Sequence, residues 1–158
     1  MIRRIFFVLL LILLSTKLVI SQYQYADGVT TSVAIPVKTS PYFSKIGYSA
    51  GYFQEFFITE RISIFTGASM VIFKLDQDYK LEDYFDWNVI DVLFDFGPKF
   101  YHGMFYTSFK CGIIWAEQMV WAFMPQAGLW FEKLDIGLGY THSKHYRYYE
   151  IKLNVYFD

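Results

Sequence analysis

The sequence predicts an all-β fold: an eight-stranded antiparallel up-and-down transmembrane β-barrel that follows an N-terminal signal peptide. Three observations lead to this prediction. Apolar and polar residues alternate in segments of about ten residues as far as the C-terminus, as in barrel strands. An apolar leader precedes these segments. Aromatic residues make up 22% of the 158 residues and charged residues only 18%, a balance that suits a bilayer, where Trp and Tyr favour the interfaces.

Residues 1–21 have the three parts of a secretory signal peptide. Arg3 and Arg4 form a positive n-region, and an unbroken apolar run follows over residues 5–14. Ser21 supplies the small residue before the expected cleavage point. The remaining chain, residues 22–158, is then a single barrel domain.

An uncleaved membrane anchor over residues 5–20 is the alternative to a signal peptide. This span is shorter than the roughly 20 residues that a transmembrane helix needs. Lys17 also interrupts it. We therefore favour cleavage.

Eight segments show the alternation expected of strands and are separated by turn-forming residues. They run near Gly28–Val37, Ser44–Phe57, Glu60–Leu75, Trp87–Gly97, Phe100–Ile113, Val120–Phe131, Leu134–Thr141 and Tyr149–Asp158. No helical periodicity competes with them after the leader.

The expected connections alternate between tight and long. They are tight at Ile58–Thr59, Pro98–Lys99 and Glu132–Lys133, and longer at Lys38–Phe43, Asp76–Asp86, Ala116–Met119 and His142–Tyr148. Outer-membrane barrels have an even number of strands, short periplasmic turns and longer extracellular loops. The pattern therefore predicts both chain ends on the periplasmic side.

Successive side chains of a strand point to opposite faces, so the sequence separates the two faces. In the second expected strand, Ile46, Tyr48 and Tyr52 share one face, while Gly47 and Gly51 lie on the other with the charged residues. The other strands repeat this association of charge with Gly and Ser. Because a narrow barrel has room inside only for side chains, we expect small and charged residues in the lumen.

The inward charges have both signs and predict a salt-bridged, packed lumen. The expected network comprises Lys45, Glu55, Arg61, Asp91, Asp95, Lys110, Asp135, Glu150 and Lys152. Within it we expect Lys110 or Lys152 to neutralise Asp91 and Asp95. A catalytic carboxylate pair at Asp91 and Asp95 is the alternative interpretation of those two residues.

On the outer face we expect aromatic anchors at the membrane interfaces. The candidates are Trp87, Trp115, Trp121 and Trp130, which lie at or near the ends of the expected strands. Cys111 is the only cysteine, so we expect a small buried or lipid-facing side chain rather than a disulfide. A soluble periplasmic β-sandwich or lipocalin-like barrel is the alternative fold. A soluble barrel would have its apolar face inside and its charges outside, and a sandwich would not place Gly so regularly on the charged face.

Several segments also carry a family resemblance. These are Gly47–Phe53 leading into Thr59–Phe65, then Asp95–Lys99, and Leu134–Tyr140. They resemble the small outer-membrane β-barrel proteins of Bacteroidetes, the porin-like family related to the OmpA/OmpX type, over most of residues 28–158. The resemblance implies assembly by the barrel-assembly machinery through the last strand, and no general porin conduction at this size. The family usually ends on an aromatic residue, whereas here Asp158 follows Phe157.

The segment Thr141–His145 is faintly similar to lipid A deacylase barrels, which place His and Ser two residues apart on one strand near a Glu. Here the corresponding residues would be Ser143, His145 and Glu150. The two-residue spacing puts a nucleophile and base on one strand face, but the order is reversed. A polar extracellular loop is the preferred interpretation, and we expect no enzyme.

No other chemistry is indicated. His102 is far in sequence from His142 and His145, so no cluster has zinc-ligand spacing. The acidic residues of Asp76–Asp86 lack the glycine and spacing of a calcium loop. A net charge of −1 argues against nucleic-acid binding. We expect no metal and no cofactor.

The sequence therefore predicts an integral barrel of a bacterial outer membrane with a structural or surface-interaction role, in envelope integrity or adhesion. Expected partners are outer-membrane lipid and lipopolysaccharide, the barrel-assembly machinery, and an unidentified partner of the Asp76–Asp86 loop. A lipid A-modifying hydrolase and a small-solute channel are the alternative functions.

Overall fold

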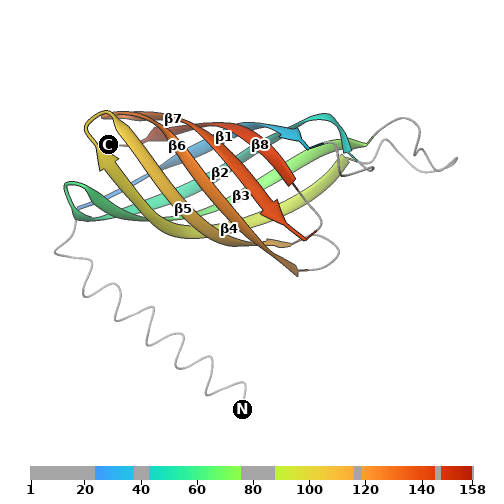
Figure 1. Cartoon of the computed structure of the whole chain (residues 1–158), viewed down its shortest axis with the longest axis horizontal. Helices are drawn as coiled ribbons and strands as arrows, with labels where there is room; N and C mark the ends of the chain where they lie inside the picture. Colours follow the sequence, from blue (N-terminus) through green and yellow to red (C-terminus); the bar gives the residue numbers. More distant parts are fainter. Residues whose placement is uncertain (1–23, 38–42, 76–87, 116–118, 145–146, 158) are drawn as a thin grey trace, which may run out of the picture.

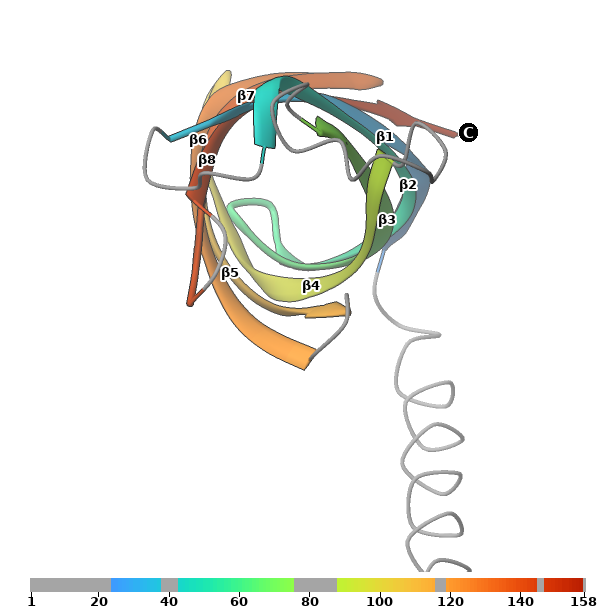
Figure 2. The same ribbon diagram turned by 90° about the vertical axis from the view of Figure 1, so that its right-hand side faces the viewer.

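The computed structural model describes residues 24–37, 43–75, 88–115, 119–144 and 147–157. The strands are β1 Tyr25–Pro36, β2 Phe43–Thr59, β3 Ile62–Leu75, β4 Asn88–His102, β5 Phe105–Trp115, β6 Met119–Phe131, β7 Leu134–Ser143 and β8 Arg147–Tyr156. Each strand pairs antiparallel with the next, and β8 pairs with β1, which closes the barrel (Figure 1). Figure 2, viewed along the barrel, shows this ring of strands. The predicted eight-stranded antiparallel barrel is confirmed.

Short turns gather at one end of the barrel. They join β2 to β3 at Glu60–Arg61, β4 to β5 at Gly103–Met104, and β6 to β7 at Glu132–Lys133. The start of β1 and the finish of β8 lie at the same end (Figure 1). We call it the turn end, and the opposite end the loop end. Among the described residues, no helix is long and apolar enough to cross a membrane.

The expected turn at Pro98–Lys99 is wrong, because β4 continues through both residues. Pro98 pairs with Ile64 of β3, while pairing with β5 skips it and resumes at Lys99 in the same register. A proline removes one hydrogen-bond donor, so it interrupts the ladder on one side without ending the strand. The chain turns at Gly103, whose φ of 66° suits glycine.

Two glycines of the inner face leave room for larger polar side chains. A Cβ on Gly67 would lie 2.5 Å from Oδ1 of Asp95. A Cβ on Gly137 would lie 2.2 Å from both the Tyr106 hydroxyl and Nε2 of Gln126. At these two positions the absence of a side chain thus allows long polar side chains to pack in a narrow lumen.

Candidate functional site

The lumen near the turn end is organised around one buried lysine. Lys99 on β4 is 2% exposed, and its Nζ lies 2.6 Å from Asp135 Oδ2, 2.7 Å from the Tyr156 hydroxyl and 3.3 Å from Glu55 Oε2. An ammonium group has three N–H donors, and these contacts use all of them. Lys99 therefore connects β4 with β2, β7 and β8.

Both carboxylates that Lys99 binds are fully buried and accept further hydrogen bonds. Glu55 accepts from the hydroxyls of Ser63 and Tyr101, and Asp135 accepts from Asn154 Nδ2 at 2.7 Å and from the Tyr106 hydroxyl. The Tyr156 hydroxyl lies 2.8 Å from both Glu55 Oε2 and Asp135 Oδ2 and, with its single proton, donates to one of them at a time. Buried carboxylates are tolerated only when they are paired and hydrogen-bonded in this way.

Aromatic rings enclose the Lys99 ammonium. Its Nζ lies 4.3 Å from the ring centroid of Tyr106, 5.0 Å from that of Tyr101 and 5.5 Å from that of Tyr156. The distances to Tyr106 and Tyr101 permit cation–π attraction, which is strongest when the cation is desolvated, whereas Tyr156 contacts the ammonium through its hydroxyl. We call Glu55, Lys99, Tyr101, Tyr106, Asp135 and Tyr156 the Lys99 cluster.

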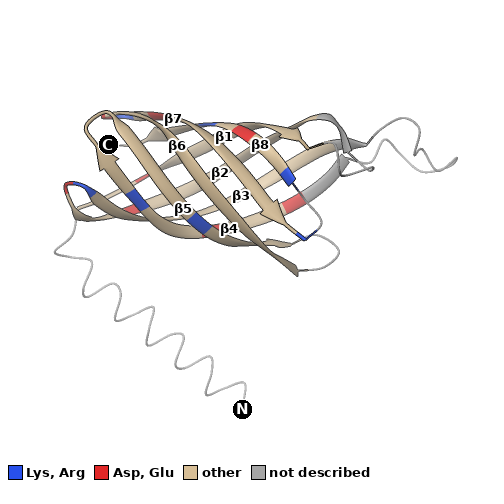
Figure 3. Cartoon of the chain, in the orientation of Figure 1, with Lys and Arg blue, Asp and Glu red and all other residues tan. Residues whose placement is uncertain are grey.

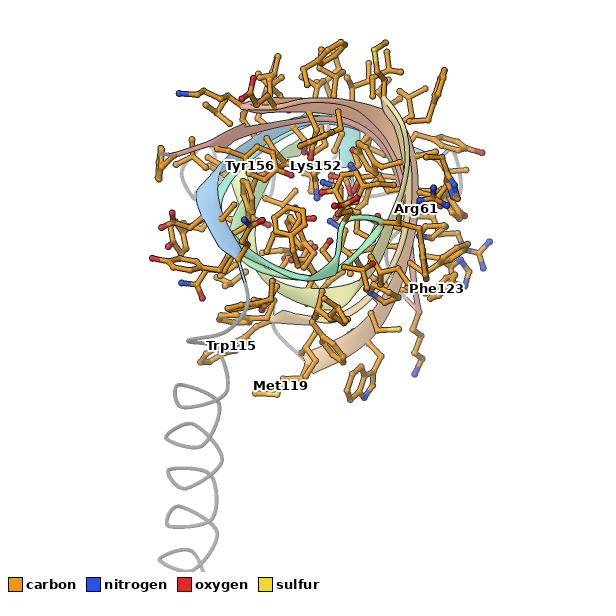
Figure 4. The ribbon with its side chains drawn as sticks, turned by 90° about the vertical axis from the view of Figure 1, so that its left-hand side faces the viewer. Arg61, Trp115, Met119, Phe123, Lys152 and Tyr156 are labelled. Carbon is orange, nitrogen blue, oxygen red and sulfur yellow. The ribbon has the colours of Figure 1, made fainter. Side chains whose placement is uncertain are left out.

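A second ionic group contains Lys110 and Lys152. Lys110 Nζ lies 3.2 Å from Asp95 Oδ2 and 4.0 Å from the ring centroid of Phe65. Lys152 Nζ lies 3.5 Å from Glu150 Oε2, and Glu150 also accepts from Thr141 Oγ1 at 3.1 Å. Figure 4, viewed from the turn end, shows Lys152 and Tyr156 inside the ring of strands. In this group each lysine thus faces one carboxylate.

Apolar side chains occupy the lumen toward the loop end, a feature that the sequence did not predict. They form one buried cluster of Ala34, Val71, Phe73, Leu93, Ile114, Ala122, Met124 and Tyr148. We call it the apolar cap. Phe73 and Tyr148 meet edge to face within it, with ring centroids 5.4 Å apart. The Lys99 cluster and the apolar cap therefore lie toward opposite ends of the lumen.

The structure places most of the expected charge network inside the barrel. Buried members are Glu55, Asp91, Asp95, Lys110, Asp135, Glu150 and Lys152. Arg61 is a correction: it is exposed in the β2–β3 turn, where the strand alternation that assigned it inward no longer holds. The side chain of Lys45 lies outside the described residues.

The expected neutralisation holds for one of the two β4 carboxylates. Asp95 pairs with Lys110, whereas Oδ1 of Asp91 has no hydrogen-bond partner among the described residues. Asp91 pairs in register with Val71 and lies toward the loop end, next to residues of the apolar cap. The two carboxylates therefore have different surroundings.

Sequence reasoning missed Lys99, the centre of the larger cluster, because it assigned that residue to a turn. The alternation itself contained the signal. Asp95, Gly97, Lys99 and Tyr101 continue one face of β4, while Pro98 and Phe100 continue the other. The proline suggests a turn locally, but in the structure it only interrupts the hydrogen-bond ladder with one of the two neighbouring strands.

The catalytic alternative gains no geometric support. Ser143 is buried at the end of β7, and Glu150 pairs in register with Gly139, four residues earlier on that strand. The Glu150 carboxylate contacts Thr141 and Lys152. His145 lies outside the described residues. The described chain also contains no group of three or more His, Cys, Asp or Glu side chains placed to hold a metal ion.

On the outer wall, Trp115 and Trp121 are 57% and 69% exposed, and Cys111 is exposed as well. Figure 4 shows Trp115, Met119 and Phe123 pointing away from the barrel. Trp130 is a correction to the expected set of anchors, because it packs inward against Phe53, Phe65 and Tyr156. Trp87 lies outside the described residues.

Comparisons of the chain with protein-family models, curated proteins and solved structures give no match. The resemblance to Bacteroidetes barrels stays a prediction that rests on the sequence segments. A function for this chain therefore has to be inferred from the barrel itself, from its packed lumen and its outer wall.

Proposed function

We propose that the protein is an integral barrel of a bacterial outer membrane, with a packed lumen and a structural or surface-interaction role. The observation that carries the proposal is the chemistry of the outer wall. Among outward side chains that the structure describes on the strands, Asp, Glu, Lys, Arg and His occur only at Asp27, His102, His142 and Arg147. Each lies within three residues of a strand end.

The wall between these rims is apolar and widely exposed. Leu138 is 67% exposed, Phe96 57%, Phe109 50% and Ile151 50%. Figure 3 marks the charged positions, and the strands are mostly uncharged. A continuous apolar belt of this kind exceeds the patches that soluble monomers leave in water. Lipid tails are the environment that matches it, as in transmembrane barrels.

The interior supports a structural role over conduction. Ion pairs and hydrogen bonds engage the charged groups of the Lys99 cluster, and the apolar cap lies in the lumen toward the loop end. Ions cross apolar constrictions poorly because they lose hydration there. We expect planar bilayers containing the protein to show no stepwise conductance, and regular conductance steps would favour the channel alternative.

Cys111 offers a direct test of membrane insertion. In lipid vesicles we expect a water-soluble maleimide to leave Cys111 unlabelled until the protein is unfolded, because lipid covers that side chain. Glu132→Cys in a Cys111→Ser background is the control, since the β6–β7 turn stays in water. Rapid labelling of folded Cys111, or a monodisperse protein without detergent, would refute membrane insertion.

The surface role depends on the connection at residues 76–86, which lies outside the described residues. We expect its deletion to leave barrel folding unchanged, measured by heat-modifiable gel mobility. Adhesion or detergent resistance of the cells should fall. If adhesion and detergent resistance are both unchanged in cells that carry the shortened, folded barrel, the surface role is contradicted. The barrel proposal is not affected by that result.

A further inference from the structure

One carboxylate on the outer wall lies near the turn end. Asp27 is the third residue of β1 and shares the outward face with Tyr25 and Val29, which are 59% and 44% exposed. It pairs in register with Gln54 of β2. Its carbonyl accepts a hydrogen bond from the backbone N–H of Phe157. Asp27 thus lies on β1 between its two neighbours, β2 and the end of β8.

The Asp27 carboxylate is held in place from one side only. The Tyr52 hydroxyl donates to Oδ2 at 2.5 Å, and Gln54 Nε2 lies 3.4 Å from that hydroxyl. Within the described residues these are the side-chain contacts of the group. A carboxylate has about four acceptor positions, so Oδ1 keeps its capacity to accept from a further donor.

Aromatic side chains surround this carboxylate on the outer wall. Tyr25 pairs with Phe56 across the β1–β2 ladder, with ring centroids 6.5 Å apart and planes inclined by 30°. Tyr52 lies diagonally on the other side of Asp27, and Phe157, the residue after β8, is 49% exposed. The Asp27 carboxylate therefore lies among aromatic side chains on the outer wall.

This combination has the chemistry of an ammonium site. An ammonium N–H donates to a carboxylate in a short, charge-assisted hydrogen bond. The faces of Tyr and Phe rings attract the same cation through their quadrupoles. An anion or a neutral hydroxyl group would gain neither interaction.

The position within the barrel selects the source of the ammonium. Asp27 lies where the apolar belt meets the turn end, the level at which headgroups lie if the barrel spans a bilayer. We propose that Asp27, with Tyr25, Tyr52 and Phe56, binds the primary ammonium of an ethanolamine phospholipid headgroup. This inference rests on the proposed membrane function and adds a specific lipid partner to it.

The test compares lipids that differ only in the headgroup. The exported protein is folded into bilayers containing equal parts of dioleoyl phosphatidylethanolamine, phosphatidylcholine and phosphatidylglycerol, and the lipids retained on it are counted by native mass spectrometry. We expect about three- to fivefold enrichment of ethanolamine lipid over choline lipid, from one charged hydrogen bond plus ring contacts. Choline offers no N–H donor, and the glycerol lipid is an anion.

Asp27→Asn should abolish the enrichment, and Tyr25→Leu should reduce it by removing one ring. Glu132→Gln is the matched control, because it removes a carboxylate at the same end of the barrel, in the β6–β7 turn and away from the β1–β2 rings. Heat-modifiable gel mobility establishes folding for each variant. If Asp27→Asn fails to fold, the enrichment measured with Tyr25→Leu decides the test, and unchanged enrichment would then contradict the site.

Equal retention of the three lipids by the folded protein would overturn the site, as would equal losses in Asp27→Asn and Glu132→Gln. Enrichment of choline lipid to the same level as ethanolamine lipid would also overturn it. These outcomes leave the barrel inserted in the bilayer. Failure of the membrane proposal is distinguishable, because the protein would then insert into none of the bilayers.

Discussion

Lys99 on β4 and Asp135 on β7 form an ion pair with 2.6 Å between Nζ and Oδ2, and both side chains are buried. The two strands are not neighbours in the barrel. The pair therefore crosses the lumen, and with Glu55 on β2 it ties separate parts of the wall together. Because the sheet fixes only adjacent strands, such a cross-link constrains the shape of the barrel cross-section.

Removing the central ammonium should destabilise the barrel strongly. Lys99→Met leaves Glu55 and Asp135 buried without their cation, and loss of one partner of a buried pair costs about 3–5 kcal/mol. Urea titration of the protein in lipid, followed by heat-modifiable gel mobility, measures the loss. Arg61→Met, in the exposed turn, should change stability little.

A rescue variant separates charge from packing in the same cluster. Lys99→Met combined with Glu55→Gln and Asp135→Asn also removes the two carboxylates that would otherwise be buried without a cation. We therefore expect part of the lost stability to return. A triple variant no more stable than Lys99→Met alone would mean that packing of the lysine stem dominates. Wild-type stability of Lys99→Met itself would indicate a lumen wet enough to solvate both carboxylates.

Lys110→Met tests the second ionic group. It removes the partner of Asp95 at 3.2 Å while keeping a side chain of similar length over Phe65. We expect a loss of about 3–5 kcal/mol, as for other buried pairs broken on one side. Ile136→Leu, an apolar exchange on the outer wall, is the comparison and should cost little. Equal stabilities of the two variants would argue that Asp95 does not depend on Lys110.

Gly137→Ala should disturb the Tyr106–Gln126 contact. The new Cβ would lie 2.2 Å from both the Tyr106 hydroxyl and Gln126 Nε2, which are joined by a hydrogen bond of 2.7 Å. Overpacking of this kind typically costs about 1–3 kcal/mol. At Gly139 on the same strand the nearest atom is 3.2 Å away, on the flexible Glu150 side chain, so Gly139→Ala should cost less. Urea midpoints of the two variants give the comparison, and the reverse order would contradict this packing.

A charge on the outer wall tests what surrounds the barrel. Leu138→Arg places a cation on the middle of β7, and a lipid-facing arginine near the bilayer centre costs about 2–4 kcal/mol. His142→Arg, on the same face but next to the strand end, should be tolerated. Folding yields in vesicles distinguish the two. If Leu138→Arg folds and resists urea as well as His142→Arg, the wall faces water.

Much of the barrel can be predicted from local sequence. Alternation over Leu134–Thr141 or Ser44–Phe57 reflects a two-residue side-chain period that needs no tertiary information. The resulting assignment placed Glu55, Asp135 and Glu150 on the inner face, where the structure has them. The Glu132–Lys133 turn was also predicted, because polar residues between two alternating segments favour a turn.

Other features depend on contacts between distant strands. Pro98 resembles a turn residue locally, yet pairing with β3 on one side carries β4 past it, and Lys99 consequently enters the lumen. The partners of Lys99 are separated from it by as many as 57 residues in sequence, at Tyr156. No local pattern reports such a distance. Nor does alternation show where along the lumen a residue lies, which is why the apolar cap was not foreseen.

The sequence by itself determined the strand number, their antiparallel order and the two faces, because these depend on side-chain periodicity and turn chemistry. Tertiary structure alone decided which inward charges form pairs and where along the barrel axis they lie. It grouped Lys99 with Glu55 and Asp135, paired Lys110 with Asp95, and placed Asp91 beside the apolar cap. The physical reason is the register shift between neighbouring strands of the closed sheet. It sets how far along the barrel axis each strand lies, and it is a property of the whole barrel.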